Sequence, residues 1–81
     1  MKEVRIPKLG MSTVEVDVLR VLVEVGQRVE AGDPLLEIEG EKTSLEVEAE
    51  VGGRVVEVLV EDEDIRNVGD VVVRIEEDDS V

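Results

Sequence analysis

Apolar and polar residues alternate along much of the chain, and a period of two is typical of half-buried β-strands. The alternation is clearest in residues 44–49, where every second residue, beginning with Leu45, is apolar. A second alternating run begins at Val14 and then gives way to the nearly all-apolar residues 18–23. Either both faces of that strand are covered or a β-bulge shifts its register, and the pattern fits both alternatives.

This pattern, together with its glycine and proline breaks, predicts six strands. They cover residues 3–7, 14–23, 34–39, 44–49, 54–60 and 71–76. The intervening segments are expected to be turns and loops, with an acidic loop at residues 61–64 and a polar tail after residue 76. No stretch shows a sustained helical period with caps, so we expect an all-β domain with little or no helix.

A 37-residue internal repeat places residues 22–39 over residues 59–76. The identical pairs are Leu22/Leu59, Val23/Val60, Glu24/Glu61, Gly32/Gly69, Asp33/Asp70, Ile38/Ile75 and Glu39/Glu76. Two copies are too few for a solenoid but fit two similar halves packed face to face, each supplying one sheet of a sandwich. Chance similarity among Val- and Glu-rich strands is the alternative, and the matched Gly-Asp pairs count against it.

A polar turn with one glycine joins the strands at residues 34–39 and 44–49, so these residues predict a hairpin with Lys42 at its tip. In the second copy of the repeat, the residue equivalent to Glu39 leads into the C-terminal tail. If a pseudo-two-fold axis relates the halves, the hairpin tip and the chain termini lie at opposite ends of the domain.

Composition narrows the possible functions. The chain has 81 residues, a net charge of −13, and no cysteine, histidine or aromatic residue. The acidity argues against nucleic-acid and anionic-membrane partners, although it also fits a role in solubility alone. No apolar run approaches the length of a membrane span and no signal-peptide core is evident, so we expect a cytoplasmic protein, monomeric as an isolated domain.

An independent enzyme is not expected from these residues. An exposed lysine has a pKa of about 10.4, so Lys42 is a poor nucleophile at neutral pH but is accessible to modification by another enzyme. The carboxylates of Glu39 and Glu41, or of Asp62 and Asp64, have no histidine or aromatic wall beside them in the sequence. The run at residues 61–64 also lacks the spacing of a calcium loop, so no metal site is expected.

Four segments carry a resemblance to a known family. They are residues 7–12, 26–35, 38–47 and 68–76, and they cover almost the whole chain. Together they resemble the lipoyl domain of the dihydrolipoamide acyltransferase component of 2-oxo acid dehydrogenase complexes. The resemblance implies a flattened barrel of two four-stranded antiparallel sheets with quasi-two-fold symmetry, spanning residues 1–76, with residues 77–81 as a tail or the start of a linker.

The resemblance also implies site residues. Lys42 would carry covalent lipoate, and Glu39, Glu41 and Thr43 would be recognised around it. The residues expected to contact partner proteins are those of the loop after the first strand: Lys8, Leu9, Gly10, Met11 and Ser12. No catalytic residue and no metal ligand is implied.

The implied function is that of a swinging-arm carrier. A lipoate-attaching enzyme would modify Lys42, and the arm would take an acyl group from a thiamine-diphosphate-dependent 2-oxo acid dehydrogenase, with pyruvate the preferred substrate. It would pass that group to coenzyme A at the acyltransferase core, and dihydrolipoamide dehydrogenase would reoxidise it. The hard chemistry belongs to the cofactor, and the domain contributes tethering and recognition.

Several residues depart from the family pattern. Glu41 and Thr43 flank the lysine where the family has Asp and a small residue, Val21 replaces a frequent Trp, and Glu63 replaces a usual Gly. Two alternatives to a lipoyl domain remain. The first is a biotinyl domain, which shares the fold but has its lysine between two methionines. The second is an unmodified structural or docking module.

Overall fold

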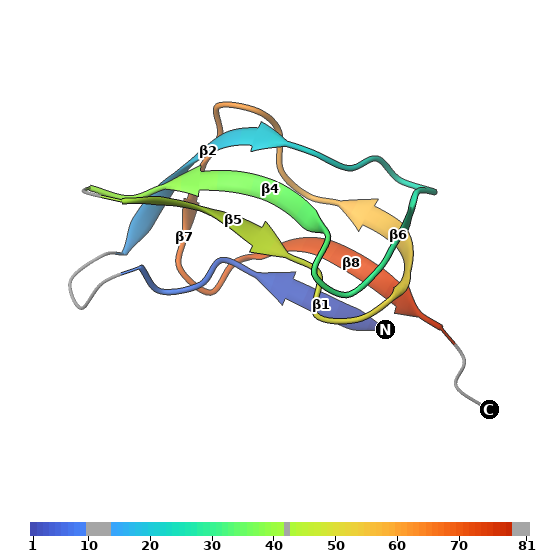
Figure 1. Ribbon diagram of the computed structural model, residues 1–81. Helices are drawn as coiled ribbons and strands as arrows, with labels where there is room; N and C mark the ends of the chain where they lie inside the picture. The colour runs from blue at the N-terminus through green and yellow to red at the C-terminus, as the bar shows by residue number, and fades with distance from the viewer. Residues whose placement is uncertain (10–13, 42, 79–81) are drawn as a thin grey trace.

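The computed structural model describes residues 1–9, 14–41 and 43–78, which form two antiparallel sheets packed face to face (Figure 1). The strands are β1 (Lys2–Arg5), β2 (Glu15–Val21), β3 (Arg28–Val29), β4 (Pro34–Glu39), β5 (Ser44–Glu48), β6 (Gly53–Val58), β7 (Ile65–Asn67) and β8 (Val71–Glu77). No helix occurs in these residues. The prediction of an all-β fold with two four-stranded sheets is therefore confirmed.

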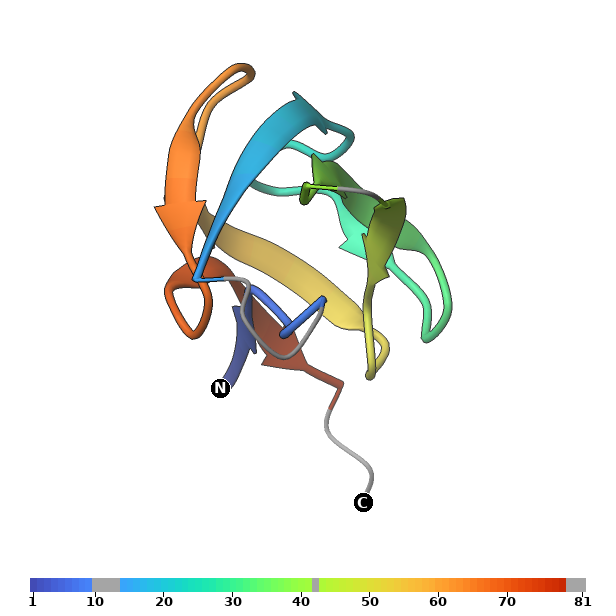
Figure 2. The same ribbon diagram turned by 90° about the vertical axis from the view of Figure 1, so that its left-hand side faces the viewer.

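The two sheets have matching strand orders, β1-β8-β6-β3 and β5-β4-β2-β7. Replacing each strand by the one four places along the chain converts one order into the other, which is the quasi-two-fold relation that the repeat indicates. Figure 2 looks along the length of the domain and shows the sheets facing each other. Every neighbouring pair is antiparallel.

The two halves of the chain interleave. Each sheet takes two strands from the first half and two from the second, because β1 and β3 join β6 and β8 while β2 and β4 join β5 and β7. The expectation that each half supplies one sheet is therefore wrong. A sequence repeat specifies a symmetry relation but not which strands pair, so the repeat alone fits both arrangements.

A β-bulge explains the apolar run in β2. The pairing with β4 advances from Val18↔Ile38 to Arg20↔Glu37, which leaves Leu19 as the extra residue. Val18 is fully buried, whereas Leu19 is 41% exposed, so the run does not lie between two covered faces. The equivalent bulge occurs in β6 at Val56, where the pairing with β8 advances from Val55 to Glu57.

Strands β3 and β7 lie in segments where the sequence predicts turns and loops. They contain two and three residues, which is too short for an alternating pattern to be recognised. Both are edge strands, β3 paired with β6 and β7 paired with β2. Tertiary pairing, rather than local periodicity, defines them.

The core lies between the sheets and is entirely aliphatic, without a buried polar or charged residue among those described. Its fully buried members come from both sheets and include Val18, Leu36, Ile38, Val55 and Ile75. Burying one such side chain contributes roughly 1.5–3 kcal/mol. The branched aliphatic side chains therefore supply the apolar burial that stabilises the domain, because the chain contains no aromatic residue.

The repeat also reproduces two turns in atomic detail. Asp33 accepts a hydrogen bond from the Glu30 backbone N–H, and Asp70 accepts one from the Asn67 N–H (2.8 and 2.9 Å). The preceding glycines have φ near +94° and +93°, a conformation that suits residues without a Cβ. The Gly-Asp pairs of the repeat are therefore turn residues that the fold requires.

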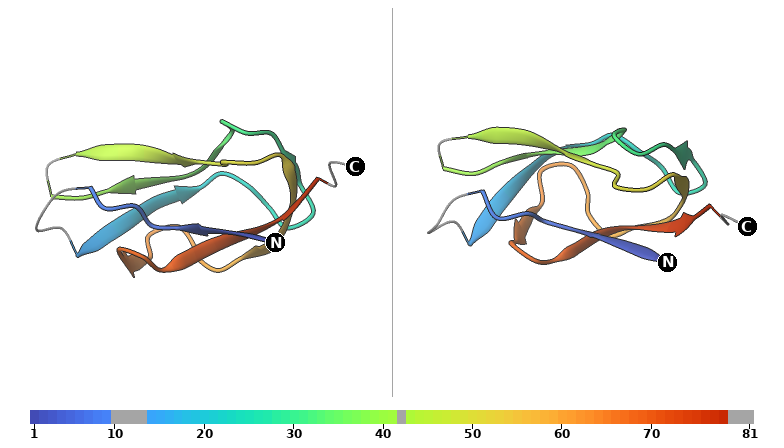
Figure 3. Two further views of the ribbon diagram at one scale, coloured as in Figure 1. Left: turned by 90° about the horizontal axis from the view of Figure 1, so that it is seen from below. Right: turned by 60° about the horizontal axis from the view of Figure 1, so that its bottom comes forward.

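The domain is elongated, with principal extents of 41 × 22 × 17 Å. The β4–β5 hairpin lies at one end of the long axis, and the N- and C-terminal parts of the chain lie towards the other (Figures 1 and 3). This agrees with the arrangement expected from the pseudo-two-fold relation. The structure therefore has two poles, one formed by the hairpin and one facing the termini.

Candidate functional site

The hairpin between β4 and β5 is the candidate site. The strands stay paired up to Glu39↔Ser44, and the Gly40 backbone N–H donates to the Thr43 carbonyl oxygen at 2.8 Å. This bond joins the two strands at the end of the hairpin. Lys42 itself lies outside the described residues, but the described residues on both sides of it belong to the hairpin.

The predicted recognition residues Glu39, Glu41 and Thr43 are all exposed. Glu39 and Glu41 also line a shallow groove beside the hairpin, which we name the tip groove. It is lined by Glu15, Val16, Asp17, Glu39, Gly40, Glu41 and Ile65. The structure thus brings two predicted residues together with residues of β2 and β7 that the sequence did not indicate as functional.

The predicted partner-contacting loop is described only in part. Lys8 is exposed, and Leu9 is half-buried and packs against the core. Gly10, Met11 and Ser12 lie outside the described residues. Their assignment, like the attachment of lipoate to Lys42, stays a prediction.

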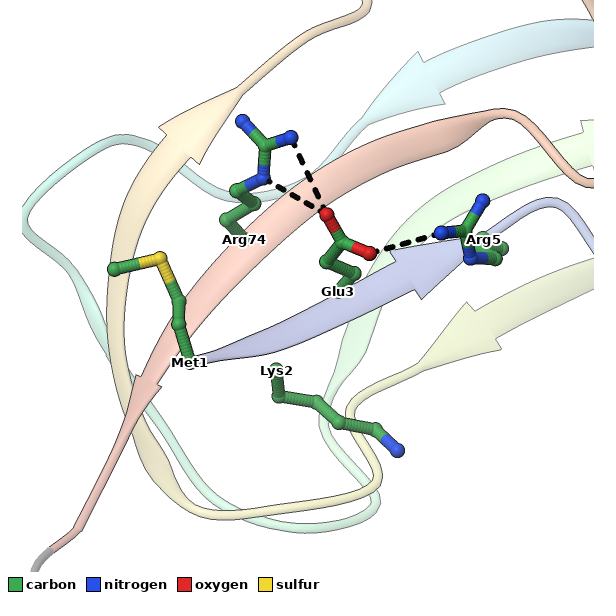
Figure 4. Close-up of a pocket in the computed structure, with 5 residues that line it drawn as sticks. All are labelled: Met1, Lys2, Glu3, Arg5 and Arg74. Atoms are coloured by element: carbon green, nitrogen blue, oxygen red, sulfur yellow. Dashed lines mark hydrogen bonds and ion pairs between the residues drawn. The ribbon is translucent and has the colours of Figure 1, made fainter.

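A second pocket lies on β1 and β8, on the other sheet, and is lined by Met1, Lys2, Glu3, Arg5 and Arg74 (Figure 4). Glu3 accepts hydrogen bonds from Arg5 at 2.8 Å and from Arg74 at 3.3 Å. Arg74 donates hydrogen bonds to Glu57 and to Glu3. These bonds, the one to Glu57 above all, raise the pKa of the Arg74 guanidinium. Glu3 therefore holds both arginines of this pocket in ion pairs.

No group of three or more acidic residues among the described residues is arranged to hold a metal ion. No helix in the same part of the chain is long and apolar enough to cross a membrane. The described residues of the hairpin, Glu39, Glu41 and Thr43, are exposed. This exposure suits a group attached to the surface better than a cofactor held inside the fold.

Comparison with known families decides the assignment. The family model of biotin- and lipoyl-attachment domains, described as "Biotin-requiring enzyme", matches residues 2–75. The chain belongs to the biotin/lipoyl family. Membership accounts for the paired four-stranded sheets and for the prominence of the hairpin.

Curated relatives of this biotin/lipoyl domain are much longer proteins. The dihydrolipoyllysine-residue acetyltransferase component of the pyruvate dehydrogenase complex of Corynebacterium glutamicum is 38% identical over 73 residues, covering 90% of this chain and 11% of that protein. The corresponding component of Staphylococcus aureus is 35% identical over 78 residues, covering 96% of the chain and 18% of the protein. The chain therefore spans less than a fifth of the length of these relatives.

Solved structures support the fold. The lipoyl domain of the 2-oxoglutarate dehydrogenase complex of Azotobacter vinelandii superposes with a TM-score of 0.78 at 22% identity, covering 95% of this chain and 98% of that one. Urea carboxylase of Kluyveromyces lactis gives a TM-score of 0.77 at 28% identity, covering 93% of this chain and 6% of that one. Both superpositions extend over nearly the whole biotin/lipoyl domain.

Proposed function

We propose that this domain is a swinging-arm carrier that holds lipoate as an amide on Lys42. The observation that carries the proposal is the exposed, hydrogen-bonded β4–β5 hairpin at the pole away from the termini. A group attached between Glu41 and Thr43 would face away from whatever the termini are joined to. The relatives named for a dihydrolipoyllysine residue support the same function.

The residues around the hairpin fit a covalent arm. Glu39, Glu41 and Thr43 are exposed, so they are available to an enzyme that must recognise the turn before modifying it. The hydrogen bond between Gly40 and Thr43 holds the two strand ends together. Residues that are already held in place on either side of the lysine lower the ordering that recognition requires.

The chain and the attached group have separate tasks. Lipoate, when bound, supplies a dithiolane that carries acyl groups and reducing equivalents. The hairpin holds the attachment point, and the sheets behind it hold the hairpin away from the terminal pole. An attached linker would keep the arm near its partner active sites and raise the effective concentration there.

We assign the partners by extension from the relatives. They are a lipoate-attaching enzyme, a thiamine-diphosphate-dependent 2-oxo acid dehydrogenase acting on pyruvate, an acyltransferase core and dihydrolipoamide dehydrogenase. Supporting this assignment, the similar proteins are named as components of the pyruvate dehydrogenase complex. A cytoplasmic location belongs to the same proposal. We place the domain boundary after residue 78 rather than after residue 76, because β8 continues to Glu77 and Asp78 binds Arg28.

A biotinyl carrier is the second candidate, and the similarity to urea carboxylase favours it. The residues flanking Lys42 count against it, because biotinyl domains resemble one another in placing the lysine between two methionines. Here Glu41 and Thr43 stand at those positions. Lipoate is therefore the preferred group.

The intact mass of the domain isolated from its native host tests the assignment. We expect an increase matching one lipoyl group, absent in Lys42→Arg and retained in Lys8→Arg, which makes the same change at another exposed lysine. Circular dichroism of Lys42→Arg is expected to match that of the unmodified protein. A biotinyl increment, an unmodified mass or an unfolded Lys42→Arg would each contradict the proposal.

A further inference from the structure

The tip groove has a symmetry-related counterpart at the terminal pole, which we name the terminal groove. It is lined by Arg28, Arg54, Glu76, Glu77 and Asp78. The 37-residue offset of the repeat, continued beyond residues 22–39 and 59–76, relates all five lining residues of the terminal groove to residues of the tip groove. The equivalent pairs are Ile65/Arg28, Asp17/Arg54, Glu39/Glu76, Gly40/Glu77 and Glu41/Asp78. The two grooves therefore share a backbone frame but differ in their side chains.

The terminal groove contains its own arginine. Both terminal nitrogens of Arg28 donate to the Asp78 carboxylate, at 2.7 and 2.6 Å. This hydrogen bonding lowers the pKa of Asp78. Arg54 lies directly opposite Glu76 on the neighbouring strand, so opposite charges face each other across the sheet. The groove shows that this backbone frame accommodates a guanidinium bound to a carboxylate.

The tip groove has the carboxylates of such an ion pair but not the guanidinium. Four carboxylates line it, from Glu15, Asp17, Glu39 and Glu41, and no basic residue does so among the described residues. The position equivalent to Arg28 is Ile65, which is 62% exposed.

Like charges also meet across the strands at the tip. Asp17 lies directly opposite Glu39, where the terminal groove has Arg54 opposite Glu76. Like charges facing each other across a strand pair destabilise a sheet. A cation from outside the domain would relieve this repulsion.

We propose that the tip groove binds an arginine side chain of a partner protein, with the guanidinium between Asp17, Glu39 and Glu41 and a neighbouring apolar side chain on Ile65. The inference rests on the proposed function only in placing the partner at the lipoylated pole. Arginine fits better than lysine because its planar fork can bind a carboxylate through two parallel hydrogen bonds, as Arg28 binds Asp78.

Ile65 adds an apolar contact to the acidic groove. Ile65 is an exposed branched side chain within an acidic surface, and covering it removes apolar area from water. The chemistry of the groove therefore selects a basic residue beside an apolar one, rather than positive charge alone.

The first test is a titration of the Lys42→Gln domain with the peptide acetyl-Arg-Leu-amide. Binding is monitored through the changes in backbone amide NMR chemical shifts. The Lys42→Gln change removes the positive charge next to Glu41 in the sequence and makes the result independent of lipoylation. We expect shifts concentrated at Asp17, Glu39, Glu41 and Ile65. Acetyl-Gln-Leu-amide should give shifts about fivefold smaller or less, because it lacks the charge-assisted hydrogen bonds.

Two variants of the Lys42→Gln domain sharpen the titration. Ile65→Arg supplies the missing arginine in cis, and the groove shifts should disappear. Val25→Arg adds the same charge at another exposed residue outside the groove, and the groove shifts should remain. Shifts spread evenly over the acidic surface, or unchanged by Ile65→Arg, would overturn the inference.

The second test uses lipoylated domains and the host's dehydrogenase. With lipoylation of both variants checked by mass, Ile65→Arg should lower kcat/KM for reductive acylation about tenfold relative to Val25→Arg, mainly through a higher KM. Equal values for the two variants would overturn the role of the groove in docking. Absence of the lipoyl group would instead count against the proposed function, and the peptide titration would still decide the groove.

Discussion

At the scale of single residues, Glu63 is the clearest departure from what its position requires. It has a φ of +70°, while its repeat equivalent Gly26 has a φ of +95°. The two turns are otherwise alike, because Gln27 and Asp64 accept side-chain hydrogen bonds from the backbone N–H groups of Glu24 and Glu61. A left-handed conformation costs a residue with a Cβ about 1–2 kcal/mol.

Replacing Glu63 by glycine should therefore stabilise the domain. Part of the relieved strain is offset by the larger chain entropy of glycine in the unfolded state, so we expect Glu63→Gly to raise the free energy of unfolding by about 1 kcal/mol. Urea denaturation measures the change. Glu63→Ala is the matched control, since it removes the same charge but keeps the Cβ, and a gain as large as that of Glu63→Gly would refute the strain argument.

At the scale of elements, the ion pair that joins Arg28 of β3 to Asp78, the residue after β8, predicts a pH dependence. The hydrogen bonds that Arg28 donates to Asp78 lower the pKa of the Asp78 carboxylate below its usual value of 3.8, and the same bonds raise the pKa of the Arg28 guanidinium. A carboxylate with a lowered folded-state pKa stabilises the fold above its unfolded-state pKa. That stabilisation is lost as the pH falls through the folded-state value.

The Asp78→Asn variant tests this dependence. Its thermal midpoint should lie below that of the parent protein at pH 7, and the gap should stay constant down to about pH 5 and shrink below about pH 4. Differential scanning calorimetry at several pH values measures the gap. Glu77→Gln makes the same charge change one residue earlier, so a gap for Glu77→Gln with the same pH profile would show that net charge, rather than the pair, is responsible.

The elements also show how far the sequence determines the fold. Alternation such as that around Leu45, together with the glycine breaks, predicts six of the strands. A half-buried strand needs apolar residues on one face and polar residues on the other, so its sequence alternates between them. Strands β3 and β7 were missed since two and three residues carry no period. For the apolar run that contains Leu19, the sequence fits both a strand with two covered faces and a β-bulge. The exposure of Leu19 and the pairing of β2 with β4 distinguish the two.

The candidate site was predicted less completely than the fold. The hairpin and the exposure of Glu39 and Glu41 followed from local sequence. The contributions of Asp17 and Ile65 to the tip groove did not, because they depend on the neighbours of β2 and β7 in the sheet. The repeat held a usable signal, since a shift of 37 residues places Ile65 over Arg28.

At the scale of the whole molecule, charge opposes folding. Lysine and arginine number 9 against 22 aspartates and glutamates. Eight ion pairs join described residues, but all of them are partly exposed, and exposed pairs contribute little. The general repulsion of a net charge of −13 should therefore outweigh them.

Added salt should accordingly stabilise the domain. Raising NaCl from about 20 mM to about 500 mM shortens the screening length several-fold and weakens the repulsion. We expect the thermal midpoint to rise by roughly 4 °C or more, which corresponds to about 1 kcal/mol for a domain of this size. A midpoint that falls with salt would mean that the ion pairs dominate.

The interleaving of the two halves bears on how such a domain could arise. Neither half contains a complete sheet, because each sheet combines two strands from one half with two from the other. A chain of half the length would complete its sheets only by associating with a second copy around a two-fold axis. The present protein is thus equivalent to an intertwined dimer whose subunits are joined end to end, and the loss of exact symmetry has left one pole free to differ from the other.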